Sequence, residues 1–268
     1  MIVLIVLAYS LSFCSASRCG QRESANPRIV NGFIVEPKKF PFVVAIYINH
    51  GSYVCVGTLI TPKFLVTAGH CFDEGLTYNI VAGTTDLRKV EDKYRRMIKT
   101  VTKHPEYEYS YTGIKYDVAV AELDEELSLV PEKIMYASLP PFSSVIPEEF
   151  GTVLGWGDTH DENIPSETVL LGVNLIIDID CDASDEFFCL GHPDGDKDSC
   201  YGDSGGPFII NGTLYGVVSH STSADCGTGI PGRYTKIPYV VMWIREIAGL
   251  PRRLSTSCCQ HKAHRKCC

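Results

Sequence analysis

The sequence predicts an all-β body, built as antiparallel barrels or sandwiches, that ends in one helix. From about residue 29 to residue 238, short apolar and β-branched runs are separated by Gly, Pro, Asn and Asp, a pattern typical of short antiparallel strands. Segments with a helical period are almost absent there, which argues against alternating strands and helices. Such runs include residues 42–48, 58–67, 149–154, 168–177 and 213–218.

One segment near the C-terminus has the period of a helix. Within residues 239–250, apolar side chains recur at a helical spacing, at Val240, Trp243, Ile244 and Ile247. Pro251 follows and cannot continue a helix. We therefore expect a single C-terminal helix that closes the domain.

Composition and charge limit the classes of function. The chain has 268 residues, of which 45% are hydrophobic and 21% charged, so it can bury one or two cores and is neither disordered nor collagen-like. Its net charge of −8 is unfavourable for neutralising a phosphate backbone, and no nucleic-acid partner is expected. Its 12 Cys residues indicate an oxidising compartment, where disulfides persist.

The N-terminus has the features of a secretory signal. Residues 1–13 are apolar apart from Ser10 and Ser12, and small residues follow, so residues 1–17 are predicted to be a signal peptide. A membrane anchor is the alternative, but a span needs about 20 apolar residues, and polar residues interrupt this run from Ser10 onward. We expect a secreted, extracellular protein with no membrane partner.

Three separate segments carry the residue types of a nucleophilic relay. They are Thr-Ala-Gly-His-Cys at residues 67–71, Asp-Val-Ala-Val at 117–120 and Gly-Asp-Ser-Gly-Gly-Pro at 202–207. In this order, on an all-β chain, they resemble the trypsin/chymotrypsin family of serine proteases, from Ile29 to about Leu250. Further matches are Ile-Val-Asn-Gly at 29–32, Gly-Trp-Gly at 155–157 and Lys-Asp-Ser-Cys at 197–200.

The resemblance implies a trypsin-like fold, in which two antiparallel six-stranded β-barrels and a C-terminal helix occupy residues 29–250. It also implies a catalytic triad. His70 would take the proton of Ser204, because a serine hydroxyl is a poor nucleophile at neutral pH. Asp117 would orient the His70 ring, and the backbone N–H groups of Gly202 and Ser204 would form the oxyanion hole. No cofactor or metal ion is expected.

The same resemblance implies a propeptide and an activation site. Residues 18–28 would be the propeptide, and an activating protease would cut between Arg28 and Ile29. The freed amine of Ile29 would then pair with Asp203, a carboxylate that is costly to bury without a partner. The protein is therefore predicted to be made as a zymogen.

Substrate preference follows from residues that the resemblance places around the primary pocket. Asp198 matches the acid at the pocket floor, which implies protein or peptide substrates cleaved after Arg or Lys. Gly232 matches the glycine that keeps the pocket open, and Ser219 would line the cleft. The family's Ser-Trp-Gly is replaced here by Ser219-His220-Ser221. Ser221 would place a side chain at the entrance, and His220 would remove an aromatic platform.

The cysteines fall into two groups. By resemblance, three disulfides would brace the domain: Cys55 with Cys71, Cys181 with Cys189, and Cys200 with Cys226. Residues 251–268 form a basic, Cys-rich tail outside the resemblance. Its four Cys and two His could bind a metal ion, but secretion favours disulfides.

These observations predict a secreted serine endopeptidase that acts on protein and peptide substrates and is restrained by protein inhibitors. The alternative is a catalytically weak or inactive protease homologue that acts as a binding or regulatory module.

Overall fold

The computed structural model describes residues 32–49, 51–111, 113–158, 168–178, 181, 184–221, 223 and 226–252. The expected signal peptide and propeptide, with Arg28 and Ile29, lie outside the described residues, as does the tail beyond Arg252. Within the described ranges, no helix has both the length and the apolar character needed to cross a membrane.

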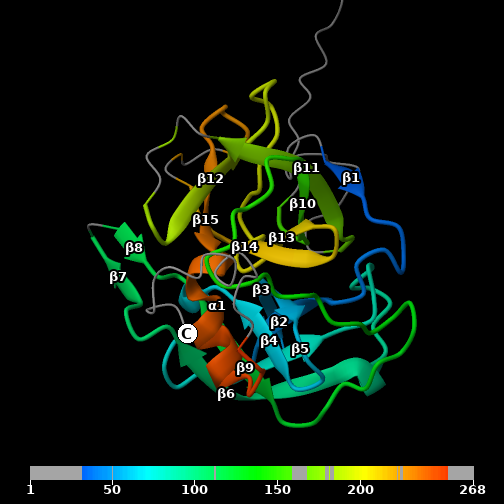
Figure 1. Ribbon diagram of the computed structural model, residues 1–268. Helices are drawn as coiled ribbons and strands as arrows, with labels where there is room; N and C mark the ends of the chain where they lie inside the picture. The colour runs from blue at the N-terminus through cyan, green and yellow to red at the C-terminus, as the bar shows by residue number, and fades with distance from the viewer. Residues whose placement is uncertain are drawn as a thin grey trace, which may run out of the picture.

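Two closed antiparallel barrels form the body of the protein, one above the other in Figure 1, and this confirms the predicted fold class. The first barrel contains six strands, which neighbour one another in the order β2 (Val43–Ile48), β3 (Ser52–Leu59), β4 (Phe64–Thr67), β9 (Ala119–Leu123), β6 (Arg95–Lys103) and β5 (Tyr78–Val81). It is the lower barrel in the figure.

The second barrel is built from strands late in the chain. Its strand order is β11 (Leu171–Asp178), β10 (Gly151–Gly155), β13 (Pro207–Ile210), β14 (Thr213–His220), β15 (Gly232–Lys236) and β12 (Phe187–Gly191). The barrel closes because β12 also pairs with β11, and β1 (Phe33–Ile34) is added along β11.

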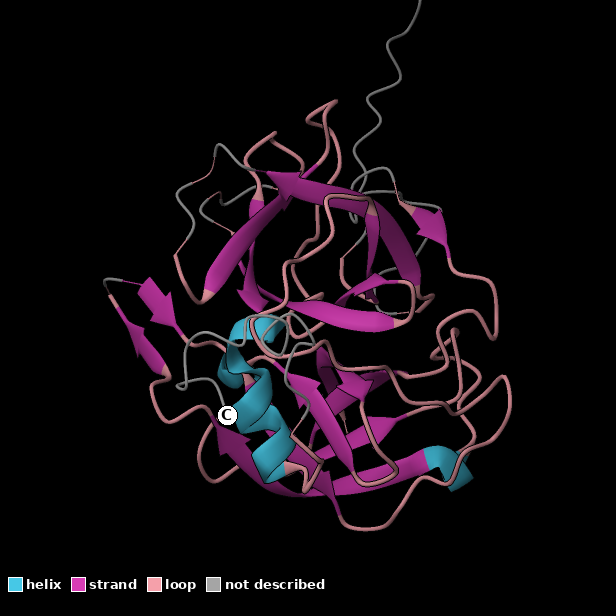
Figure 2. Cartoon of the chain, in the orientation of Figure 1, coloured by secondary structure: helices cyan, strands magenta, loops and turns pink. Residues whose placement is uncertain are grey.

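Smaller elements connect and flank the barrels. A hairpin of β7 (Glu108–Ser110) and β8 (Gly113–Lys115) projects at the left of Figure 1. Two short 3₁₀ turns are η1 (Gly69–Cys71) and η2 (Asp92–Tyr94). The α-helix α1 (Ile237–Ile247) is the large cyan coil of Figure 2.

The run at residues 58–67, expected to be one strand, is two strands joined by a tight turn. The end of β3 and the whole of β4 pair with each other, Thr58 opposite Val66. The Thr61 hydroxyl oxygen accepts the N–H groups of Lys63 and Phe64 at 3.2 and 2.9 Å, and this local bonding turns the chain. Residues 58–60 and 65–67 are buried on either side of the turn, which Pro62 and Lys63 mark in the sequence.

The helix was correctly predicted, but its bounds differ from residues 239–250. It begins earlier because Pro238 is favourable in a first turn, where its missing N–H costs nothing. It ends earlier because Gly249 adopts a positive φ of 64°, and the N–H of Leu250 bonds the Arg245 carbonyl at 2.7 Å.

The helix packs against an apolar cluster shared by the two barrels. Its buried face, through Ile237, Val240, Val241 and Ile244, joins a cluster that contains Val44 and Leu65 of the first barrel and Leu214 and Val217 of the second. Since α1 follows directly on β15 of the second barrel, it ties the two barrels together.

Candidate active site

His70 and Asp117 meet because β4 and β9 are neighbouring strands. Thr67 at the end of β4 lies opposite Ala119 at the start of β9. The segments just beyond this pair carry the two polar residues, with His70 in η1 and Asp117 before β9. The Nδ1 atom of His70 lies 2.7 Å from Oδ2 of Asp117, and the His70 backbone N–H donates to Oδ1 at 2.9 Å.

Asp117 is fully buried and receives further hydrogen bonds from the second barrel. The Ser219 hydroxyl donates to Oδ2 at 2.5 Å, and the Thr235 hydroxyl donates to the Asp117 backbone carbonyl at 2.7 Å. Burial acts to raise the pKa of Asp117, but the hydrogen bonds from His70 and Ser219 outweigh it, so the pKa lies below its usual value. The carboxylate is therefore ionised at neutral pH.

The loop that carries Ser204 is held against the segment that carries His70. Gly205 has a φ of 77°, and a Cβ atom on it would lie 2.1 Å from the Thr67 hydroxyl oxygen, so only glycine fits. The Val56 N–H donates to the Ser204 carbonyl at 2.8 Å. Across the part of the chain that is described, no hydrogen bond joins the Ser204 hydroxyl to the His70 ring. Such bonds are often long before a substrate binds.

Two backbone N–H groups of this loop stay available. The N–H groups of Asp203, Gly205 and Gly206 donate to backbone carbonyls at 2.8–3.0 Å. Those of Gly202 and Ser204 donate to no acceptor among the described residues. Backbone donors left unpaired on one loop are suited to binding a negatively charged oxygen.

Tyr53, which the sequence did not single out, also contacts this loop. Its hydroxyl donates to the Gly202 carbonyl at 2.5 Å, across 149 residues of sequence. Gly202 has a φ of 89°, in the left-handed region that favours glycine. Tyr53 therefore fixes the peptide group between Gly202 and Asp203, which directly follows the free N–H group of Gly202.

Asp203 is completely buried beside the Gly-Trp-Gly segment. Its carboxylate accepts the N–H groups of Gly157 at 3.0 Å and Cys200 at 2.8 Å. A Cβ atom on Gly155 would lie only 2.0 Å from the carboxylate, which explains the glycine at this position. No Lys, Arg or His of the described ranges forms an ion pair with Asp203, and burial raises its pKa to about 7.

Asp198 is a second buried acid, 3% exposed. Its Oδ1 atom accepts the Ser199 N–H at 2.7 Å, and a Cβ atom on Gly232 would approach that oxygen to 3.1 Å. Burial raises the pKa of Asp198 to about 7, and the hydrogen bond from Ser199 offsets only part of this effect. A cationic group that reached Asp198 would gain a buried carboxylate as its partner.

The three expected disulfides are present and brace these segments: Cys55–Cys71, Cys181–Cys189 and Cys200–Cys226. The first joins β3 to the turn that carries His70, and the third lies two residues beyond Asp198. Each cross-link limits the unfolded chain and keeps a site segment in place.

Comparisons with known proteins agree on one family. The family model described as Trypsin matches residues 29–244. Trypsin 5G1 of Aedes aegypti is 32% identical over 235 residues, 83% of this chain and 86% of that protein. Brachyurin of Leptuca pugilator is 32% identical over 233 residues, 83% of this chain and 99% of that protein. This chain belongs to the trypsin family of serine proteases.

Two further comparisons extend this result. Serine protease 1 of Homo sapiens is 30% identical to this trypsin-family chain over 230 residues, 82% of the chain and 89% of that protein. The solved structure of neuropsin, described as a serine protease expressed in the limbic system of mouse brain, has a TM-score of 0.71 at 23% identity. The match covers 81% of this chain and 99% of the neuropsin chain, and it supports the fold alone.

In this trypsin-family chain, Ser219 and His220 end strand β14, and Ser221 follows it. Ser219 is buried against Asp117, His220 is half-buried, and Ser221 is exposed and accepts the Ser223 N–H at 3.1 Å. The His220 Nδ1 atom lies 3.0 Å from the Ser219 hydroxyl oxygen. His220 thus directs a polar atom toward the Ser219 hydroxyl.

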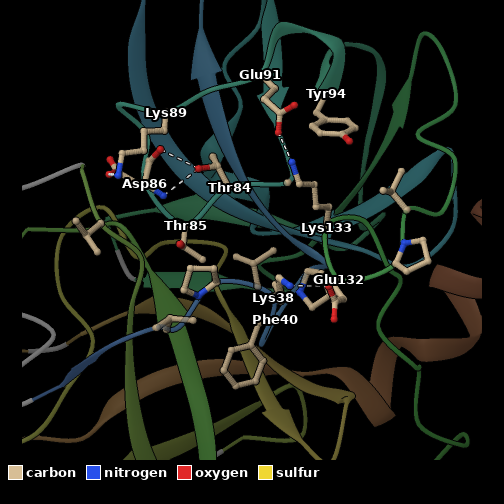
Figure 3. A pocket seen from close by; sticks show the side chains of 18 of the residues that line it. Lys38, Phe40, Thr84, Thr85, Asp86, Lys89, Glu91, Tyr94, Glu132 and Lys133 are labelled. Atoms are coloured by element: carbon tan, nitrogen blue, oxygen red, sulfur yellow. Dashed lines mark hydrogen bonds and ion pairs between the residues drawn. The ribbon is translucent and has the colours of Figure 1, made fainter.

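A pocket of about 710 Å³ lies apart from these residues (Figure 3). It is lined by the segment after β1, by residues 83–94 and by residues 130–133. Ion pairs cross its rim, Lys133 with Glu91 at 2.5 Å and Lys38 with Glu132 at 2.7 Å. Since these charges neutralise one another, the pocket indicates no charged ligand.

His192, Asp194 and Asp196 gather close enough to suggest a metal site. However, the Asp194 N–H donates to Nδ1 of His192 at 3.2 Å, and the Lys197 ammonium lies 3.1 Å from Nε2. Because both ring nitrogens are engaged and a cation is adjacent, we assign no metal to this cluster.

Proposed function

We propose that this chain is a secreted serine endopeptidase, made as a zymogen, that cleaves peptide bonds after Arg or Lys. The observation that carries the proposal is the hydrogen bond between His70 and Asp117. An ionised carboxylate can only accept, so the neutral His70 ring must carry its hydrogen on Nδ1. The lone pair on Nε2 is then available as a general base.

The chemistry would proceed through an acyl-enzyme. The Ser204 oxygen bonds to the substrate carbonyl carbon while its proton moves to Nε2 of His70, and the Gly202 and Ser204 N–H groups stabilise the resulting oxyanion. His70 gives that proton to the amine as the peptide bond breaks. A water molecule then attacks the ester, passes a proton through His70 to Ser204, and releases the acid.

Asp203 supports the zymogen proposal. A fully buried carboxylate, with two backbone donors and no cation among the described groups, needs a positive partner to remain ionised. The Ile29 amine, freed by cleavage after Arg28, would supply it. Both residues lie outside the described part of the chain.

Asp198 supports the preference for basic substrates. Its carboxylate is buried beside Gly232, and a guanidinium or ammonium group would neutralise it. An apolar side chain would leave it unpaired, which selects against Phe and Leu.

Secretion is supported by the disulfides. The described residues contain three, and these persist in oxidising compartments. The expected signal peptide, residues 1–17, would direct the chain there.

The activity is tested by covalent labelling. Protein cleaved after Arg28 should react with an aryl phosphonate, and mass mapping should place the adduct on Ser204. Ser204→Ala removes the nucleophile, and His70→Ala removes the base, so both should abolish labelling. A cleaved, folded protein that takes up no label would refute the protease and favour a binding or regulatory module.

The specificity is tested by cleavage of matched peptides that differ only in carrying Arg, Lys, Phe or Ala before the scissile bond. We expect cleavage after Arg and Lys. Asp198→Asn keeps the side-chain volume but removes the charge, so this variant should lose the preference for the basic peptides. A wild-type preference for Phe would contradict the role of Asp198 and leave the triad untouched.

A further inference from the structure

A second histidine is connected to Asp117 through Ser219. The Nδ1 atom of His220 lies 3.0 Å from the Ser219 hydroxyl oxygen, and that hydroxyl lies 2.5 Å from Oδ2 of Asp117. The same Oδ2 atom contacts Nδ1 of His70 at 2.7 Å. The four groups form one continuous chain from His220 to His70.

The direction of each hydrogen bond follows from the number of protons. Asp117 is ionised and can only accept, so the single hydroxyl hydrogen of Ser219 must point at Asp117. The Ser219 oxygen can then only accept from His220. Nδ1 of His220 must therefore carry a hydrogen, whether the ring is neutral or charged.

A β-bulge in β14 allows the neighbouring side chains of Ser219 and His220 to contact each other. Successive side chains of a regular strand point to opposite faces and do not meet. Here the pairing of β14 with β15 shifts register, since Val218 lies opposite Tyr234 and His220 lies opposite Arg233. Ser219 is the extra residue of this bulge, and bulges re-aim side chains.

The His220 ring is held in place by packing. It meets the Phe187 ring edge to face, with centroids 5.4 Å apart and an interplanar angle of 85°. Burial lowers the pKa of His220, and the positive charge of Arg233 lowers it further, against the raising effect of Asp117. When the His220 ring is neutral, it places no positive charge beside Asp117. It therefore does not compete with His70 for the carboxylate.

We propose that His220 is a positioning residue for Asp117, in which the Nδ1–H group of a neutral imidazole fixes the Ser219 hydroxyl as a donor to the carboxylate. Its catalytic consequence rests on the proposed protease function. With the Ser219 rotamer fixed, the Oδ2 atom that contacts His70 is also held by the Ser219 hydroxyl. Loss of the His220 donor would let Ser219 rotate away and leave the carboxylate less constrained.

Two matched variants separate the donor from the ring. His220→Phe keeps an aromatic ring against Phe187 but removes Nδ1–H. His220→Asn gives up the ring but can place its amide nitrogen where Nδ1 lies. With a short Arg ester, kcat should fall about threefold to tenfold in His220→Phe, as for loss of one ordinary hydrogen bond, and recover in His220→Asn. Equal losses in both variants, or none in His220→Phe, would overturn the proposal.

Ser219→Ala closes a double-mutant cycle. If His220 acts through Ser219, adding His220→Phe to Ser219→Ala should cause no further loss of kcat. Independent, multiplying losses would show that His220 acts by another route, such as direct contact with substrate, and would overturn the proposal.

A proton NMR measurement tests the same chain without turnover. The hydrogen between His70 Nδ1 and Asp117 should resonate far downfield, and its shift reports on the carboxylate. We expect it to move in His220→Phe and to stay near wild type in His220→Asn, in uncleaved protein as well. If wild-type protein is labelled at Ser204 but the resonance does not move in His220→Phe, only the positioning role of His220 is refuted. Wild type that does not label refutes the protease, and the resonance still decides the role of His220.

Discussion

Asp117 is the residue at which hydrogen bonds from both barrels converge. His70, from the first barrel, binds its carboxylate, while Ser219 and Thr235, from the second, bind its carboxylate and its carbonyl. The buried charge is tolerated because these bonds lower its pKa in spite of burial. The position of the His70 ring therefore depends on how the two barrels dock.

Tyr53 gives a prediction for the proposed oxyanion hole. Tyr53→Phe removes the hydroxyl that holds the Gly202 carbonyl at 2.5 Å. The Gly202 backbone should then move more freely, so kcat on an Arg ester should fall about threefold to tenfold while KM changes little, because the donors matter most in the transition state. Steady-state kinetics of the cleaved protein would measure both constants.

The matched control is Tyr136→Phe. The Tyr136 hydroxyl also donates to a backbone carbonyl, that of Leu127, at 2.7 Å, and among the described residues no hydrogen bond joins Tyr136 or Leu127 to the Ser204 loop. Tyr136→Phe should lower the free energy of unfolding by an amount similar to Tyr53→Phe and leave kcat unchanged. If both variants lower kcat equally, the effect belongs to general stability, and the role given to Tyr53 is wrong.

Residues within short motifs could be identified from the sequence, while those acting across long separations could not. His70, Asp117 and Ser204 each lie in a recognisable segment. Tyr53 and Thr235 reach their partners over 149 and 118 residues and lie in no motif. Only the packing of the barrels brings them to the site.

At the scale of elements, predictability followed the apolar pattern. The expected runs at 42–48, 149–154, 168–177 and 213–218 each correspond to one strand, β2, β10, β11 and β14, with ends shifted by a few residues. Strand β6 gave no such signal, because it carries four Lys or Arg residues among nine and has no fully buried residue. Its place in the barrel comes from pairing with β5 and β9.

The β3–β4 turn gives a prediction about stability. Thr61→Ala removes the oxygen that accepts two backbone N–H groups, so the unfolding free energy should fall by about 1 kcal/mol. Thr61→Ser keeps the acceptor and should lose much less. Chemical denaturation of the two variants would compare them. Equal losses would mean that the methyl group, not the oxygen, stabilises the turn.

At the scale of the whole molecule, the barrels themselves could not be worked out from periodicity. Alternating runs favoured barrels and sandwiches equally, and the choice came from the resemblance of the His, Asp and Ser segments to a family. Closure depends on pairings between distant strands, such as β4 with β9 and β11 with β12. Nothing local in these segments specifies their partners.

Cleavage after Arg28 should change how the stability of the whole protein depends on pH. Burial raises the pKa of Asp203 from 3.8 to about 7. Uncleaved folded protein thus holds a proton that the unfolded chain releases, and its stability falls as the pH rises from about 4 to about 7. An ammonium group from Ile29 would lower this pKa and remove the loss. The stability that cleaved protein gains over uncleaved protein is therefore full above about pH 7 and shrinks below it.

The measurement compares cleaved and uncleaved Ser204→Ala protein, which cannot digest itself. The difference in unfolding free energy should be larger near pH ~7.5 than near pH ~5, by about 1–3 kcal/mol, since each pKa unit is worth about 1.4 kcal/mol. Titrating groups that the cleaved and uncleaved forms share affect both alike and cancel. Asp203→Asn, which cannot ionise, should make the difference independent of pH. A difference equally large at both pH values in protein that retains Asp203 would mean that the new amine does not pair with this carboxylate.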